Sequence, residues 1–449
     1  MPGSINVLFL VFDTMRLDAI SVYDEKRITP NFSKLASESI VFKNNISSAP
    51  WTVPSHASMF TGKYPMEHHV QFSNGNRDFL ATSKLMNEYK GSTIAEFLQK
   101  HGYSTYGVSA NTGIIPGSGF DRGFDIFTFF DPMGNFTLNN EWSSVKENVV
   151  KRFGDTKKEI FKNMLFKDNP VSTFGVLNKY FKVRKRVNNS YKRYDFPMNK
   201  SGQQIIDAMQ RTSLSQPFFF FINFMEFHEP YVRDFSPQQE QAYSLGLTNP
   251  SRKIIEGVRS AYYREAEQAD WELGQVIKFL KENNIYDNTA LVMTSDHGQS
   301  LFEHDFYGHG IFLHDELIRV PLMIKLPMPQ PRQRIINELF SNTGLYDTVK
   351  SLIYDADPII QSFPFVLSEA DGSWKVPDSL ISENEDAIKR LKIMDSRRVA
   401  IFKEGFKLVV NGTGKNVEYF GKDGRTADRE QYRDVYSDLF ETVSIVGWS

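Results

Sequence analysis

Short runs of consecutive apolar residues recur along the chain and alternate with stretches that have a helical repeat. Continuous apolar runs are typical of parallel strands covered on both faces, whereas a strand with one wet face alternates apolar and polar positions. The predicted strands are residues 7–12, 104–109, 217–224, 289–294 and 320–326, and the predicted helices are 94–101 and 258–283. This order of elements predicts an α/β fold.

The last part of the chain has a different pattern. Residues 398–402 and 406–410 are short β-like runs on either side of Lys403-Glu404-Gly405, which predicts a hairpin, and 417–420 predicts a third strand. We therefore expect a main α/β domain at 1–385, with an insert at about 130–210, followed by a small α+β subdomain at 386–449.

The predicted insert is basic and aromatic. Residues 141–200 hold 15 Lys and Arg against 6 Asp and Glu, a local excess of +9, and the densest basic segment is 182–186. One interpretation is a lid that attracts an anionic substrate or surface. The other is an amphipathic helical insertion with a solvated basic face, and the sequence leaves both open.

Composition narrows the class of protein. The 449 residues carry a formal net charge of -2, with 41% hydrophobic and 24% charged residues, so we expect a globular chain with no nucleic-acid partner. There is no cysteine, which excludes disulfides, thiolate metal sites and a cysteine nucleophile. The absence of cysteine fits a reducing compartment, so we expect a cytoplasmic protein. The apolar run 6–12 is shorter than the roughly 20 residues that span a bilayer, and we expect no transmembrane segment.

Three of the predicted strands end next to residues that can bind metal or transfer protons. Asp13 follows the first strand, His228 lies just after the Phe-rich run, and Asp296-His297 follows the run at 289–294. Ligands of open α/β sheets sit at the carboxyl ends of the strands, so a shared site is the functional interpretation. The structural alternative is that polar residues simply follow strands.

The segment Ala49-Pro-Trp-Thr52-Val-Pro54-Ser-His56 predicts the start of a helix that ends at Gly62. Thr52 lies at or beside the predicted N-cap, and capping alone would explain it. The alternative is that Thr52 attacks an anionic ester held at the helix N-terminus. A threonine hydroxyl needs a base or a metal for that chemistry.

A mixed oxygen and nitrogen ligand set for one divalent ion is present in the sequence. Asp13, Asp296, His297 and the Thr52 hydroxyl together suit Mn, Mg, Ca or Zn. His309 lies between Gly308 and Gly310, which predicts a tight loop with a close approach.

Taken together, these motifs resemble the sulfatase family of the alkaline phosphatase superfamily. The resemblance rests on the strand ending in Asp13, the Thr52-Val-Pro-Ser-His-Ala-Ser-Met-Phe-Thr-Gly62 segment, Ser295-Asp-His-Gly298 and Arg319-Val-Pro-Leu322. It covers nearly the whole chain except the basic insert. It implies a large mixed, mostly parallel sheet sandwiched by helices, and a metal-dependent ester hydrolase or transferase.

Several positions depart from the family pattern. Thr52 stands where sulfatases have a Cys or Ser that becomes formylglycine, so no formylglycine is expected. His56 and His309 replace the family's arginine and lysine, and Thr14 replaces its second N-terminal aspartate. A threonine nucleophile resembles instead the phosphoglycerol transferases and phosphodiesterases of the superfamily.

The resemblance also bears on the number of metal ions and on the substrate contacts. The Asp-x-x-x-His spacing of two-zinc phosphodiesterases falls on Asn223 and Phe227, so a second metal is not expected. His228 matches the sulfatase histidine that contacts substrate. Thr14 and Asn74 are further candidates for substrate contacts.

The resulting hypothesis is a covalent displacement at phosphorus or sulfur. Thr52 attacks in line, His56 and His309 stabilise developing charge, and His228 protonates the leaving alcohol. The expected substrate is a small anionic ester, or one linked to a glycan or lipid, with phosphodiester or phosphonate ester favoured. The alternatives are a formylglycine-independent sulfate-ester hydrolase, a phosphoglycerol-type transferase and an inactive anion-binding relative. The sequence does not indicate an oligomeric state.

Overall fold

A computed structural model places most of the chain in defined positions. It describes residues 5–72, 77–131, 178–179, 182, 200–231, 237–327, 333–354, 360–361, 363–372, 385–412, 416–421, 426–428, 430 and 433–445. The chain divides into two compact units, residues 1–129 with 202–449, and residues 130–201. The site described below lies in the first unit. Most of the predicted basic insert lies outside the described residues, and so does Asn74.

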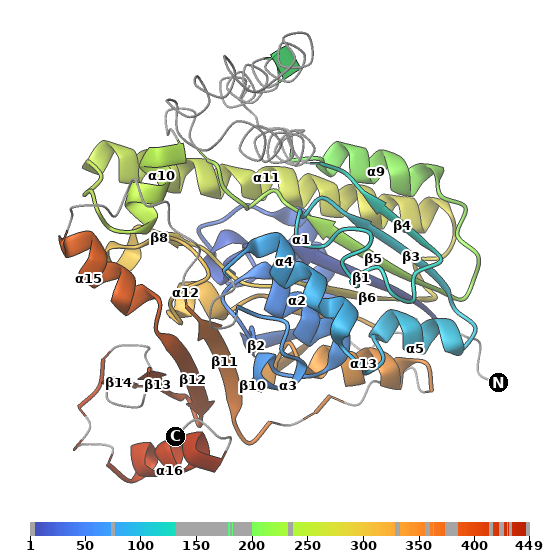
Figure 1. The fold of residues 1–449 in the computed structure, drawn as a ribbon. Helices are drawn as coiled ribbons and strands as arrows, with labels where there is room; N and C mark the ends of the chain where they lie inside the picture. The colour runs from blue at the N-terminus through green and yellow to red at the C-terminus, as the bar shows by residue number, and fades with distance from the viewer. Residues whose placement is uncertain are drawn as a thin grey trace, which may run out of the picture. The chain divides into compact units, whose positions relative to one another are not determined.

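The first unit is built on an eight-stranded sheet in the order β10-β2-β9-β6-β1-β5-β3-β4 (Figure 1). All neighbours pair in parallel except β9, which is antiparallel to β2 and β6. The strands are β1 (Asn6–Phe12), β2 (Ile40–Ile46), β3 (Ser104–Ser109), β4 (Ile126–Phe129), β5 (Phe218–Phe224), β6 (Thr289–Thr294), β9 (Leu322–Lys325) and β10 (Arg334–Ser341). The predicted fold class, a mixed and mostly parallel sheet, is confirmed.

Helices cover both faces of this sheet. In Figure 1, α9 and α11 lie above it, and α2, α5 and α13 lie below. The α-helices of the unit are α1 (Pro30–Ser37), α2 (Thr52–Thr61), α3 (Pro65–His68), α4 (Phe79–Lys84), α5 (Ile94–Lys100), α9 (Gly202–Arg211), α10 (Pro237–Ser244), α11 (Arg252–Glu282), α12 (Asp315–Ile318), α13 (Gly344–Leu352), α15 (Glu385–Met394) and α16 (Arg433–Ile445). Short 3-10 turns span Leu17–Ala19, Leu85–Glu88 and Glu303–Asp305. Among the described residues, no helix has the length and apolarity needed to cross a membrane.

The two-sided cover explains the apolar runs of the sequence. Every residue of β1, β5 and β6 is buried, so neither face of these strands needs polar side chains. The helix predicted at 258–283 begins earlier, at Arg252, because the Ser251 hydroxyl accepts a hydrogen bond from the Ile254 N–H and caps it. Between α5 and β3, Gly102 takes a φ of +84°, a conformation that favours glycine.

The C-terminal region forms the predicted small sheet. Four antiparallel strands run in the order β11-β12-β13-β14, at Val366–Asp371, Arg397–Lys403, Phe406–Asn411 and Asn416–Phe420. Glu404 and Gly405 form the predicted hairpin turn with φ values of +52° and +86°. Strand β11 precedes residue 385, and the predicted boundary at 385 stays a prediction. A separate two-stranded ribbon joins β7 (Ser300–Leu301) and β8 (Tyr307–Gly308) beside the site.

Candidate active site

Asp13 follows β1 at the centre of the large sheet, and its side chain is fully buried. The backbone then turns sharply, with Thr14 at a φ of +57°. The Thr14 N–H donates to Asp296 Oδ1 at 3.2 Å, and the Tyr262 hydroxyl donates to the Thr14 carbonyl at 2.9 Å. The end of β1 is thereby held against the end of β6, its neighbour in the sheet. Thr14, a predicted substrate contact, lies at the site and is buried.

Thr52 is the first residue of α2, directly after the N-cap residue Trp51. Its side chain does not cap the helix: Thr52 Oγ1 donates to Asp13 Oδ2 at 3.3 Å and lies 3.4 Å from His297 Nε2. Thr52 is 4% exposed. The helix N-terminus and the ends of β1 and β6 therefore meet at the Thr52 hydroxyl, and capping does not explain this residue.

Two serine hydroxyls hold the loop after β6, one from Ser47, which follows β2, and one from Ser55 of α2. Ser47 and Ser55 both donate to the main-chain oxygen of Asp296, Ser55 at 2.6 Å. Inside the loop, the His297 N–H donates to Asp296 Oδ1 at 2.9 Å. The His297 Nδ1 donates to the Gly298 carbonyl at 2.9 Å, which leaves Nε2 as the atom that faces Thr52.

The three side chains Asp13, Asp296 and His297 fit a divalent cation. Their ligand atoms lie within 4.8 Å of one another, and all three residues are buried. Among the described residues, Asp13 Oδ1 and Asp296 Oδ2 find no hydrogen-bond partner, and each lies near His297 Nε2, at 3.8 and 3.4 Å. Buried carboxylate oxygens without partners are costly unless a cation binds them. The metal ligands predicted from the sequence are thus brought together.

The electrostatics of the buried carboxyls point the same way. Burial raises the pKa of Asp296 to about 7, and burial together with the nearby Asp296 raises the pKa of Asp13 well above its ordinary value. Burial lowers the pKa of the His297 imidazole, so the ring is neutral and can bind a metal ion through its lone pair. A bound dication would stabilise the ionised form of these two carboxyls, which resist ionisation when no opposite charge is near.

His56 lies one turn into α2 and is fully buried. Its Nδ1 donates to the Thr52 carbonyl at 3.0 Å and lies 3.4 Å from Asp296 Oδ2. Burial lowers the pKa of His56 to about 4, so this environment favours the uncharged ring. Its predicted role in stabilising charge at the reacting centre stays a prediction.

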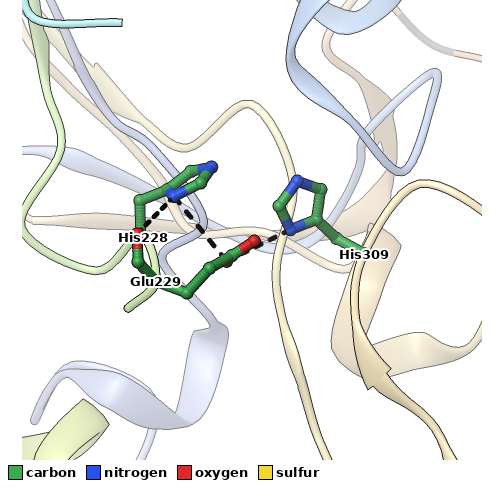
Figure 2. Close-up of side chains that lie close together, drawn as sticks. All are labelled: His228, Glu229 and His309. Carbon is green, nitrogen blue, oxygen red and sulfur yellow. Dashed lines mark hydrogen bonds and ion pairs between the residues drawn. The ribbon is translucent and has the colours of Figure 1, made fainter. Parts of the chain in front are cut away.

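His228 and His309 come together at the rim of the site with Glu229, as Figure 2 shows. The two rings meet edge to face, with centroids 5.2 Å apart, and the His309 ring lies 4.5 Å from the His297 ring. His309 Nδ1 donates to Gln299 Oε1 at 2.8 Å. These histidines are partly exposed, whereas Asp13, Asp296 and His297 are fully buried. The rim is therefore the side from which a substrate would enter.

Sequence reasoning assigned no role to two residues of the site, Asn111 and Glu229. Asn111 follows β3, and its Nδ2 donates to Asp13 Oδ2 at 2.6 Å and to Thr52 Oγ1 at 3.3 Å. Its Oδ1 accepts from the Gly113 N–H at 2.7 Å, which fixes the amide orientation. The signal that identified Asp13, a polar residue just after a strand, applies equally to Asn111.

Comparison with known proteins gives the family. The model of the sulfatase family matches residues 5–355. The chain belongs to the sulfatase family. This confirms the resemblance to sulfatases seen in the motifs.

Individual relatives are distant. Human arylsulfatase D is 23% identical over 407 residues, a match that covers 78% of this chain and 65% of that protein, just under two thirds of it. An N-acetylgalactosamine-6-O-sulfatase of Bacteroides thetaiotaomicron is 21% identical over 98% of this chain and 89% of that protein.

Solved structures share the fold over almost the whole chain. A phosphonate monoester hydrolase of Agrobacterium radiobacter has a TM-score of 0.62 at 17% identity, covering 98% of this chain and 95% of its own. A putative sulfatase from Bacteroides thetaiotaomicron has a TM-score of 0.65 at 15% identity, covering 99% and 91%. These similarities concern the fold.

Replacing Asn111 with alanine tests its contribution to the site. The variant loses the donor that orients both Asp13 and Thr52, so we expect metal affinity or kcat to fall by about 10- to 100-fold. Asn87→Ala is the matched control, because the Asn87 side chain donates to the Gly117 carbonyl at the surface. Metal titration and steady-state kinetics measure the effect. An Asn111→Ala enzyme that matches the Asn87→Ala enzyme in both would show that Asn111 is a bystander.

Proposed function

We propose that this sulfatase-family chain is a metal-dependent ester hydrolase that uses Thr52 as its nucleophile. The observation that carries the proposal is the position of Thr52 Oγ1 at 3.3 Å from Asp13 Oδ2 and 3.4 Å from His297 Nε2. The hydroxyl lies beside the one fully buried group of potential metal ligands found in the described residues. The chain has no cysteine, so a formylglycine derived from cysteine has no precursor.

The residues divide the work as follows. Asp13, Asp296 and His297, with the Thr52 hydroxyl, would hold one divalent ion, Mn, Mg, Ca or Zn. When bound, this ion lowers the pKa of the Thr52 hydroxyl and polarises a substrate oxygen. Asn111 keeps the hydroxyl aimed, because it donates to both Thr52 and Asp13.

The reaction would proceed in two displacements. Thr52 Oγ1 would pass its proton to Asp13 Oδ2, the oxygen to which it donates, and bond to phosphorus, and the bond from phosphorus to the leaving oxygen would break as His228 supplies a proton to that oxygen. Water would then attack phosphorus as His228 takes its proton, and the bond from phosphorus to Thr52 would break as Asp13 returns the proton to Oγ1, which restores the hydroxyl. His309, when protonated, would donate a hydrogen bond from Nε2 to one of the remaining oxygens. The single N–H of the neutral His56 ring already donates to the Thr52 carbonyl, so His56 would support the nucleophile's backbone instead.

Phosphorus esters are the favoured substrates. A formylglycine diol has a second hydroxyl that expels sulfate by elimination, whereas a threonine ester must be cleaved by attack at the central atom. Such attack suits a phosphoryl centre whose charge is held by a metal and by hydrogen-bond donors. The sulfate-ester hydrolase remains the second candidate, since the sequence relatives named above are sulfatases. A phosphoglycerol-type transfer to an alcohol would differ only in the acceptor of the second step.

Matched nitrophenyl esters decide between the two substrate classes. We expect kcat/KM for a phosphodiester or a phosphonate monoester to exceed that for the sulfate ester, measured on one enzyme preparation with each divalent metal. The control is the metal-free enzyme, which should turn over none of them. A sulfate ester that outpaces every phosphorus ester would reverse the preference and make the chain a formylglycine-independent sulfate-ester hydrolase.

A further inference from the structure

The His228, Glu229 and His309 side chains form a second group of potential metal ligands in the described part of the chain. One nitrogen or oxygen atom from each lies within 4.8 Å of the others. Figure 2 shows the Glu229 carboxylate between the two imidazole rings. The sequence argument against a second metal considered only the spacing at Asn223 and Phe227, and none of these three residues belongs to that pattern.

Hydrogen bonds orient both imidazoles for ligation. His228 Nδ1 donates to the Glu229 carbonyl at 2.9 Å, and His309 Nδ1 donates to Gln299 Oε1 at 2.8 Å. Within the described residues, no hydrogen bond involves Nε2 of either ring, so Nε2 is the ring atom available to a metal ion when the imidazole is neutral. His297 at the first site has the same arrangement, with Nδ1 on a carbonyl and Nε2 toward the ligand set. Such outer hydrogen bonds are the usual support of metal-binding histidines.

The Glu229 carboxylate pairs with the two imidazoles at long range. Within the described residues its Oε2 forms no hydrogen bond, and it lies 3.5 Å from His309 Nδ1 and 3.7 Å from His228 Nδ1. A charge-assisted hydrogen bond would bring these atoms to about 2.7–2.9 Å. The longer separations leave this carboxylate oxygen available to a cation.

The charge of the whole centre favours a second cation. Asp13, Asp296 and Glu229 form no ion pair with a lysine or arginine of the described chain; their charged partners are imidazoles. One dication leaves this concentration of carboxyls only partly compensated.

We propose that His228, Glu229 and His309 bind a second divalent cation at the rim of the active site. Two histidines and one glutamate with an open fourth position is the ligand set of several catalytic zinc sites, and it suits Zn²⁺ better than Mg²⁺ or Ca²⁺. The side chains are 23%, 21% and 9% exposed, so an ion and a substrate oxygen can reach the site from solvent. This extends the proposed function: the second ion would stabilise the leaving oxygen, the task otherwise given to the His228 proton.

Zinc binding to the full-length chain tests the proposal without reference to turnover. The protein is stripped of metal, dialysed against Zn²⁺ and analysed for bound zinc, and crystals of the same preparation are measured at the zinc absorption edge. We expect two equivalents and two anomalous peaks, one between Asp13, Asp296 and His297 and one between His228, Glu229 and His309. A single peak at the first position would overturn the second site, and this measurement requires no variant.

Variants then show which residues bind each of the two zinc ions. His309→Gln and Asp296→Asn should each leave one equivalent, and the double variant should leave none. His304→Gln is the matched control, since His304 lies in the same loop but pairs with Glu316 outside both groups, and it should keep two. Two equivalents in His309→Gln would contradict the assignment. Two bound zinc ions with no ester turnover would remove the proposed function and leave this site standing, whereas one ion with full turnover would do the reverse.

Discussion

The Thr52→Ala variant is expected to lose at least about three orders of magnitude in kcat while keeping its fold, as happens when an enzyme loses the nucleophile of a covalent step. The helix itself should tolerate the change, because Trp51 and not Thr52 is the N-cap residue, and the Thr52 hydroxyl points to Asp13 and His297. Turnover of the preferred ester and the melting temperature are measured on the same preparation.

Two further variants sharpen this result. Thr61→Ala is the matched control, because Thr61 lies at the other end of α2, where its hydroxyl donates to the Ala57 carbonyl at 2.6 Å and accepts from the Lys63 N–H at 3.3 Å. Thr52→Ser keeps the hydroxyl and should retain kcat within about tenfold. A Thr52→Ala enzyme with nearly full activity and a loss of roughly 1 kcal/mol in unfolding free energy would mean that the residue serves only the helix terminus.

The central strands could be predicted from sequence and the peripheral strands could not, for a physical reason. β1, β5 and β6 are buried on both faces, so their apolar runs are unbroken. β2 and β10 lie toward one edge of the sheet and mix polar with apolar residues, as in Ile40-Val-Phe-Lys-Asn-Asn-Ile46. A strand with partly solvated positions gives a weaker pattern, and neither was predicted.

The site was predictable to the extent that it follows strand ends and family motifs. Asp13 and Asp296 come directly after β1 and β6, and Thr52 begins α2. Asn111 and Glu229 received no role because the family pattern names other residues there, although both are oriented toward the predicted side chains. The burial of His56, which favours its neutral form, depends on aromatic rings from α2, β5 and the loop at Phe120, and such packing is invisible in one sequence.

The Asp296→Asn variant is expected to lose one bound divalent ion and essentially all ester turnover. Asp296 supplies an unpartnered oxygen, Oδ2, to the ligand set, and an amide is a much weaker ligand than a carboxylate for a dication. The amide still occupies the same volume, so the packing against Ser47 and Ser55 through the Asp296 main-chain oxygen is kept. Metal analysis after dialysis and circular dichroism measure these two effects.

The same variant makes a prediction about stability whose sign follows from the pKa. A carboxyl whose pKa is raised to about 7 in the folded protein, from an ordinary value of about 4, destabilises the metal-free fold increasingly as pH rises between these values. Asparagine carries no such charge. At pH 8 without metal, the Asp296→Asn protein should therefore melt no lower than the unmodified protein, although it has lost its activity.

With metal added, the Asp296→Asn protein should melt at a lower temperature than the unmodified protein. Ligand at a hundred times its dissociation constant stabilises a folded protein by about 2.7 kcal/mol, and the variant forfeits this gain at the Asp13 site. Asp270→Asn is the matched control: Asp270 is also a buried carboxylate, but it accepts from the Asn31 and Phe32 N–H groups and is not one of the potential metal ligands, so this variant should melt lower yet keep the full metal-induced shift. An Asp296→Asn protein with unchanged metal content and an undiminished shift would place the ion elsewhere and remove the basis for activating Thr52.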